Sequence, residues 1–267
     1  MMTAPIVDAL EVLAAQAAAE MVPLWELPAS TIPAALMDAL PDVVDKWALA
    51  GAAVAADWYD DERERAEIAG RFSAIVDELP DLGAHSLAGW AAEPVRLDVP
   101  DLTAARYRVE GGLQKRIVNA ANLTITGSAT ADPAARGWMR TTRPGACDFC
   151  LMVAGRGGVF TRATATFACH ENCYCRAVPA WGGRELPVKP YRRSLRRGDQ
   201  ARADRWIAEN LEGKKQPAES QADIARRLLP GLEQSLKDLR AKGLAEDSPQ
   251  IEYHVAQIAK LRRQLNR

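Results

Sequence analysis

The chain has 267 residues, of which 48% are hydrophobic and 26% are charged, and its formal net charge is −1. This length allows one large domain or two to three small ones, each with a buried core. No apolar run approaches the roughly 18–20 residues that cross a bilayer. The start of the chain also lacks the basic segment and continuous apolar stretch of a signal peptide. We therefore expect a protein that is cytoplasmic when made and has no membrane partner.

The near-neutral total conceals two halves of opposite charge. Residues 1–100 contain 5 Lys/Arg and 18 Asp/Glu, a net of −13, and residues 101–267 contain the other 29 and 17, a net of +12. Such an asymmetry indicates two surfaces for different partners, the basic one suited to nucleic acid or an acidic protein. The simpler interpretation is that solvated helix faces partly neutralise each other in the fold.

Residues 1–100 are predicted to form an acidic helical region. Apolar residues recur every three or four positions from Ile6 to Met21, which is typical of an amphipathic helix. A second helix is expected after Thr31, and a longer one from Val43 to Ile68. Its predicted core anchors are Trp47, Val54 and Trp58. The breakers Pro80, Gly83, Pro94 and Pro100 predict that this region ends before residue 101.

Residues 101–181 are predicted to hold one more helix and a small α+β module. The helix should run from about Leu102 to Thr126 with Tyr107 on its inner side, and the adjacent Gly111 and Gly112 predict a kink. Beyond it, short apolar segments at residues 137–141, 159–160 and 178–181 alternate with turn residues around the cysteines. These segments favour short strands.

The remainder is predicted to be a basic linker, residues 182–200, and a C-terminal helical hairpin, residues 201–267. The linker is rich in Pro, Gly and Arg. The hairpin is indicated by leucines on both sides of Gly243 and by Ser248-Pro249, an N-cap followed by proline. Its second helix should bury a heptad-like seam: Ile251, Val255, Ile258, Leu261 and Leu265. The predicted fold class is thus mainly α, with helical regions flanking a small zinc-stapled α+β module.

All five cysteines lie between Cys147 and Cys175. Clustering of this kind points to one local site rather than to a disulfide framework. The pattern is Cys-x2-Cys, then nineteen residues, then Cys-His-x2-Cys-x-Cys. Cys-x2-Cys and His-x2-Cys pairs suit tetrahedral zinc, so we expect a structural Zn²⁺ site. A redox Cys-x2-Cys would need a thioredoxin-like βαβ context, which is missing from the pattern.

Six candidate ligands compete for four positions on one zinc ion. Cys147, Cys150 and His170 are the first three. The fourth is either Cys173, by the x2 spacing, or Cys175, if the second thiol of Cys-x-Cys points inward. Cys169 is the weakest candidate. Four protein ligands leave no open position for water, which favours a structural role over a catalytic one.

Other chemistry finds no support in the residue pattern. A deaminase-type zinc site needs His-x-Glu before Pro-Cys-x2-Cys, whereas here the order is reversed and His170 and Glu171 are adjacent. Neither Gly-x-Ser-x-Gly nor a phosphate-binding Gly-x4-Gly-Lys-Ser/Thr loop occurs. We therefore expect a protein that is not an enzyme.

A family resemblance rests on four segments: residues 137–140, 147–152, 156–160 and 170–179. With their Cys-x2-Cys, Gly-Gly-Val-Phe and His-x2-Cys-x-Cys motifs, they resemble the minor head proteins of tailed bacteriophages. This is the Mu F-like or phage head morphogenesis family, especially versions from phages of actinobacteria. The match covers roughly residues 100–180.

The resemblance implies a minor capsid protein that acts in procapsid assembly and in DNA packaging or ejection. It implies portal and capsid proteins as partners and a place inside the head, after a period in the host cytoplasm. The basic residues 182–200 could contact packaged DNA without reading its sequence. The alternative is a zinc-dependent nucleic-acid-binding protein, although a basic linker without a helix of polar base readers favours non-specific contact.

Overall fold

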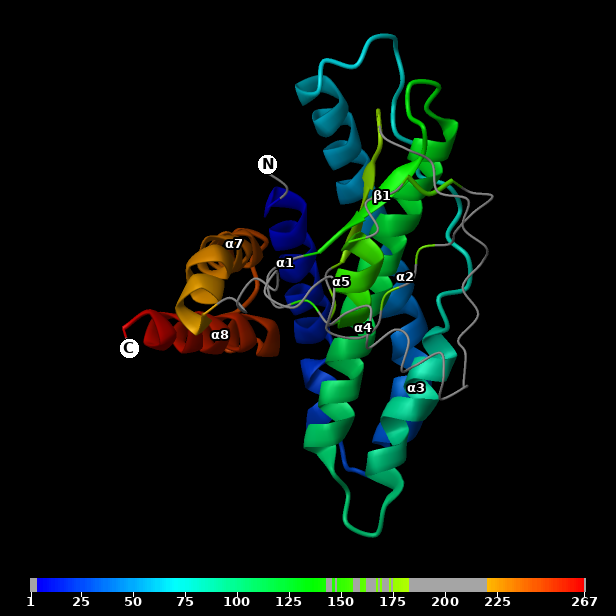
Figure 1. The fold of residues 1–267 in the computed structure, drawn as a ribbon. Helices are drawn as coiled ribbons and strands as arrows, with labels where there is room; N and C mark the ends of the chain where they lie inside the picture. Colours follow the sequence, from blue (N-terminus) through cyan, green and yellow to red (C-terminus); the bar gives the residue numbers. More distant parts are fainter. Residues whose placement is uncertain are drawn as a thin grey trace.

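The computed structural model describes residues 4–142, 148–155, 175–182 and 220–266, together with residues 146, 159–161, 167, 169 and 173. Over these residues the protein is mainly helical, with one small two-stranded sheet (Figure 1). This confirms the predicted fold class. Among the described helices, none combines the length and apolar character needed to cross a membrane.

Two long helices, α2 (Ile32–Arg65) and α4 (Leu102–Ala131), form the centre of the molecule, and α1 (Ala4–Glu20) packs against both. A short 3-10 helix, η1 (Val22–Glu26), connects α1 to α2. Small residues allow α2 and α4 to approach closely. A Cβ atom at Gly51 of α2 would lie 2.9 Å from the backbone oxygen of Ile117 in α4. Ala48, Ala52 and Ala120 are fully buried beside this contact.

The structure corrects the prediction of two helices between Thr31 and Ile68. A single helix runs through Pro41, which lies in its interior. A proline inside a helix removes one backbone hydrogen bond, so the helix must be stabilised by its packing. Leu36, Leu40 and Val44, on both sides of the proline, are at most 1% exposed.

A short helix, α3 (Ala84–Ala92), lies between the predicted breakers and continues into the 3-10 helix η2 (Glu93–Arg96). Gly83 and Pro94 therefore flank α3 instead of interrupting it. Gly112 accounts for the close contact between α3 and α4, because a Cβ atom there would collide with the Leu87 side chain. Helix α4 continues beyond Gly112 to Ala131. Tyr107, expected on the inner side of α4, is 64% exposed.

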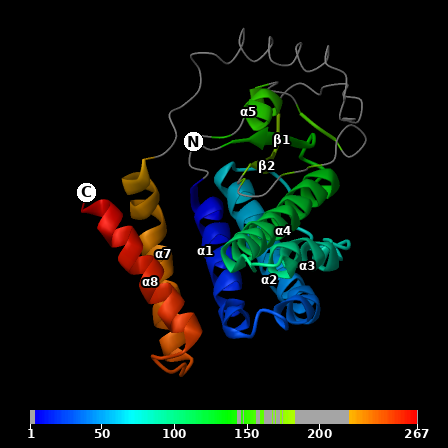
Figure 2. The same cartoon turned by 90° about the horizontal axis from the view of Figure 1, so that it is seen from below.

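The small module consists of β1 (Trp138–Thr141), β2 (Arg176–Pro179) and α5 (Asp148–Gly155). The strands are antiparallel, with Trp138 opposite Pro179 and Arg140 opposite Ala177. Trp138 also forms a bridge with Phe160, which adds a short third segment beside β1. The module lies against α4, and the C-terminal hairpin lies on another side of the helical core, beside α1 (Figure 2).

The predicted C-terminal hairpin is present as α7 (Gln221–Ala241) and α8 (Pro249–Leu265), and it packs beside α1 (Figures 1 and 2). Arg227 of α7 forms ion pairs with Asp8 and Glu11 of α1, at 3.0 and 2.6 Å. The predicted seam of α8 is wrong at one position. His254 is fully buried and hydrogen-bonded to Ser235, whereas Val255 is 43% exposed.

One hydrophobic cluster contains residues of α1, α2, α3, α4 and the small module, so residues 1–100 and 101–181 share a core. The hairpin has a cluster of its own, which includes Leu232, Ile251 and Ile258. The predicted division into 1–100, 101–181, 182–200 and 201–267 stays a prediction. Apart from Gly182, the basic linker lies outside the described residues.

Candidate metal centre

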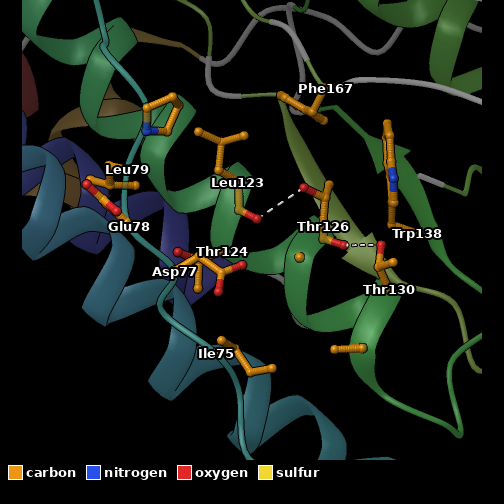
Figure 3. Close-up of a pocket in the computed structure, with 13 residues that line it drawn as sticks. Ile75, Asp77, Glu78, Leu79, Leu123, Thr124, Thr126, Thr130, Trp138 and Phe167 are labelled. Carbon is orange, nitrogen blue, oxygen red and sulfur yellow. Dashed lines mark hydrogen bonds between the residues drawn. The ribbon is translucent and has the colours of Figure 1, made fainter. Parts of the chain in front are cut away.

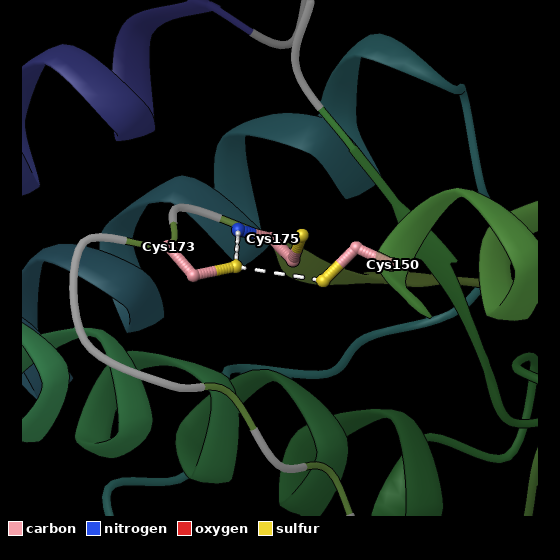
Figure 4. A group of neighbouring side chains, drawn as sticks. All are labelled: Cys150, Cys173 and Cys175. Carbon is pink, nitrogen blue, oxygen red and sulfur yellow. Dashed lines mark hydrogen bonds between the residues drawn. The ribbon is translucent and has the colours of Figure 1, made fainter. Parts of the chain in front are cut away.

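Three buried cysteines from the small module lie together: Cys150, Cys173 and Cys175 (Figure 4). Cys150 lies in α5, and Cys175 directly precedes β2. All three sulfur atoms lie within 4.8 Å of one another, and Cys150 Sγ is 3.6 Å from Cys173 Sγ. Their exposed fractions are 1%, 6% and 1%.

This geometry suits a tetrahedral metal ion. With zinc–sulfur bonds of about 2.3 Å, two thiolates on one ion lie about 3.8 Å apart, close to the separation of Cys150 and Cys173. A disulfide would need a sulfur–sulfur distance of about 2.05 Å, and these cysteines are free thiols. The backbone N–H of Cys175 points at Cys173 Sγ at 3.5 Å, an orientation that favours negative charge on that sulfur. Three soft sulfur donors at one point are a donor set for zinc or a similar thiophilic ion.

The sequence left the fourth ligand open between Cys173 and Cys175, the two thiols of the Cys-x-Cys pair. Both Cys173 and Cys175 belong to the group.

The other predicted candidates have different outcomes. Cys147 and His170 lie outside the described residues. Cys169 is described and stands apart from the three-cysteine group. Its thiol donates to Asn119 Oδ1 of α4 at 2.9 Å.

The environment disfavours charged thiols at this site when no metal is bound. The pKa of Cys150 is raised, first by hydrogen bonding to Cys173 and Cys175 and then by burial. A hydrogen bond with Cys150 lowers the pKa of Cys175, but hydrogen bonding with Cys173 and burial outweigh it and raise the value to about 12. Metal binding at this site must therefore displace protons.

Two buried amides of α4 hold the loop that carries Cys173 and Cys175. Gln114 donates to the backbone oxygen of Cys173 at 2.8 Å. Asn122 donates to the oxygen of Cys175 at 3.3 Å and accepts from the N–H of Ala177 at 2.6 Å. Sequence reasoning missed both residues, because a polar side chain on a helix usually faces water. The available signal was their spacing of eight, which places two amides on one side of α4.

A cavity of about 580 Å³ lies between α4 and the extended segment that contains Asp77, with Trp138 and Phe167 along its wall (Figure 3). The Thr126 hydroxyl donates to the Asn122 and Leu123 carbonyl oxygens, and Thr130 donates to that of Thr126. These hydroxyls are committed to the helix backbone, and the carboxyl groups of Asp77 and Glu78 also line the cavity. We assign it no activity.

Fold and site together define a helical protein with a small, cysteine-rich strand module. A family model, the VG15 protein, matches residues 4–226, most of the chain, so the protein belongs to the VG15 family. The family designation, viral gene protein 15, makes this a phage-encoded protein. Neither a curated protein nor a solved structure matches the chain.

Proposed function

We propose that Cys150, Cys173 and Cys175 hold a structural zinc ion whose fourth ligand is Cys147 or His170. The proposal is supported by the proximity of the three sulfur atoms, all within 4.8 Å of one another, and by the burial of all three cysteines. When bound, the ion would tie α5 to the segment before β2. A site closed by four protein ligands supports a structural role, and we infer that the protein is not an enzyme.

We further propose that the protein is a minor capsid protein of a tailed phage, associated with the portal and active in procapsid assembly and DNA packaging or ejection. The observation that carries this proposal is the match of residues 4–226 to a phage protein family. The resemblance of residues 137–179 to the head morphogenesis family supports it. In this role the protein resides inside the head, and the zinc-stapled module serves as a rigid element between helical surfaces.

Mass spectrometry of mature particles and of empty procapsids tests this role. The protein should be present in both, in a few to some tens of copies per particle, and should resist mild washing. Its absence from both, with the protein free in the host cytoplasm, would contradict the proposal. Tight binding to one DNA sequence at about 0.5 M salt would instead favour a regulatory nucleic-acid-binding protein, because phosphate contacts weaken steeply with salt.

Two sets of substitutions separate docking from contact with DNA. Asp38, Asp42 and Asp45 are exposed on α2 and follow one another at helical spacing, so replacing them by Lys should impair incorporation if the acidic half meets an assembly partner. Replacing the four arginines by Glu should leave incorporation intact and impair packaging or ejection: Arg192, Arg193, Arg196 and Arg197. Deleting residues 1–100 is a poor test, since α1, α2 and α3 share a core with α4.

A further inference from the structure

The cavity between α4 and residues 75–80 combines an apolar side with an acidic side. The carboxyl groups of the exposed residues Asp77 and Glu78 line it, and the described part of its wall contains no Lys or Arg. Among the described residues, neither carboxyl group has a hydrogen bond or an ion pair. Trp138 and Phe167, which are buried, lie on the opposite side of the cavity (Figure 3). The cavity therefore offers uncompensated negative charge together with apolar surface.

The stretch of chain that carries the two carboxyl groups is fixed on both sides of them. Before them, the backbone N–H of Ile75 donates to Ser128 Oγ of α4 at 2.9 Å. After them, the backbone oxygen of Gly83 accepts from the Arg116 guanidinium, also of α4, at 2.6 Å. The acidic side of the cavity is therefore formed without a ligand, which lowers the entropy cost of binding one.

Thr124 of α4 adds a buried hydroxyl to the same wall. The residue is 3% exposed, and its Oγ1 has no hydrogen-bond partner within the described part of the chain. Thr124 precedes Gly127 by three residues, so the two lie on one face of α4. A Cβ atom at Gly127 would be 3.5 Å from Asp77 Oδ2, which places that carboxyl group against this face (Figure 3). Because buried hydroxyls in native proteins normally have a partner, the unpaired Oγ1 points to a polar group of a ligand.

We propose that this cavity is a binding site, rather than an active site, for a small free amine with an apolar body. A protonated primary amine has three N–H donors and no acceptor, which suits two unpaired carboxyl groups and one unpaired hydroxyl oxygen. Its apolar body would lie against Trp138 and Phe167. A volume of about 580 Å³ is typical of small-molecule sites. A lysine of a partner protein fits less well, because it would enter with its charged end first and bring the charge to the apolar side.

Calorimetric titration of the full-length protein with hexylamine tests the proposal. Hexylamine should saturate one site with a dissociation constant of about 1 mM or below. Hexan-1-ol has the same carbon chain without the charge and should bind about 10-fold more weakly. Asp77→Asn should weaken hexylamine binding about 10-fold, and Thr124→Val about 3- to 10-fold. Thr124→Val should leave urea unfolding of the free protein unchanged or shift it to higher urea, because it removes a buried hydroxyl that has no partner.

Asp81→Asn and Thr126→Val are the matched controls, and both should bind hexylamine as the wild type does. Asp81 lies outside the lining, and asparagine keeps the oxygen that accepts from the N–H of Gly83. Thr126 lines the cavity, but its hydroxyl donates to carbonyl oxygens of α4.

Three results would overturn the proposal. The first is the absence of saturable hexylamine binding to folded wild-type protein. The second is an equal loss of affinity in Asp77→Asn and Asp81→Asn, which would reduce binding to a general effect of negative charge. The third is tighter binding of N-acetyl-lysine amide than of hexylamine, which would assign the cavity to a lysine side chain of a partner protein.

Discussion

Arg63 donates from Nε to Asp132 Oδ2 at 3.1 Å, and the two side chains are only 9% and 0% exposed. This ion pair joins the end of α2 to the residue that follows α4. Tyr59 and Trp181 donate to the same carboxylate oxygen, at 3.1 and 3.3 Å. The remaining nitrogens of Arg63 donate to the carbonyl oxygens of Ile68, Ala69 and Gly70.

Breaking this pair should strongly destabilise the fold. Asp132→Leu leaves Arg63 buried without its carboxylate, and we expect a loss of about 3–5 kcal/mol in the free energy of unfolding. The exposed pair of Arg108 and Glu93 gives the control, because Glu93 is 62% exposed. Glu93→Leu should cost no more than about 1 kcal/mol. Urea unfolding of both variants checks this, and equal losses would contradict the central role of Asp132.

The same carboxylate predicts how stability depends on pH. Burial raises the pKa of Asp132, but hydrogen bonds from the N–H of Ala134, Arg63, Trp181 and Tyr59 outweigh burial and lower it below its ordinary value. Because the folded pKa lies below the unfolded one, the contribution is present at neutral pH and is lost as the pH falls below about 4. Unfolding of the wild type and of Asp132→Asn from pH 6 to pH 3 should show a steeper decline in the wild type. Parallel curves would assign the decline to other carboxylates.

Metal content should depend on Cys150, Cys173 and Cys175 and not on Cys169. We expect about one zinc per chain, lost in Cys150→Ser, Cys173→Ser and Cys175→Ser together with the order of the small module. Cys169→Ser is the matched control, since that thiol bonds to Asn119 and stands outside the group. It should retain the metal. Elemental analysis of each variant measures the zinc content. Substoichiometric zinc in fully folded wild-type protein would argue against a structural ion.

The amides of α4 should stabilise the loop that carries the metal ligands. Asn122→Leu removes the partners of the Cys175 oxygen and the Ala177 N–H, both inside the core. Each unsatisfied buried group costs about 1–3 kcal/mol. We therefore expect lower stability and faster transfer of zinc to a chelator. Gln234, whose amide bonds to Asp238 on the exposed side of α7, serves as the control. Gln234→Leu should change neither quantity.

The C-terminal hairpin should be separable from the rest by one substitution. A Cβ atom at Gly231 of α7 would lie 2.6 Å from a methyl group of Val12 in α1. Gly231→Leu should push the hairpin away from α1 and accelerate amide hydrogen exchange across residues 221–265, with little change in α2 and α4. At Gly89 of α3, a Cβ atom would meet no heavy atom within 4 Å. Gly89→Ala should therefore leave exchange across residues 221–265 unchanged and stabilise α3 by about 0.5–1 kcal/mol.

The sequence predicted the helices because their apolar residues recur with a helical period, which is a local property. It did not predict that α2 continues through Pro41, because that depends on the packing of residues around the proline in three dimensions. His254 and Val255 show a second limit. Two adjacent positions fit a helical repeat of buried residues almost equally well. The hydrogen bond of His254 to Ser235 on another helix determines which of the two is buried.

The cysteine group was predictable because its chemistry depends on short spacings within the chain. Gln114 and Asn122 were not, since their importance comes from neighbours that are distant in sequence. A polar residue in a helix or strand normally indicates the solvent side. Here Gln114 and Asn122 are buried because they hydrogen-bond to backbone groups of another segment.

The ion pairs of Arg227 with Asp8 and Glu11, and of Arg108 with Glu93, join the basic half of the chain to its acidic half. Opposite charges that lie a few ångströms apart form short dipoles, whose potential fades faster with distance than that of separated charges. Salt at physiological concentration screens what remains beyond about 8 Å. An approaching partner therefore meets a patchwork of local potentials. Its rate of encounter should depend on ionic strength less steeply than it would if the net charges of the acidic and basic halves lay on separate surfaces.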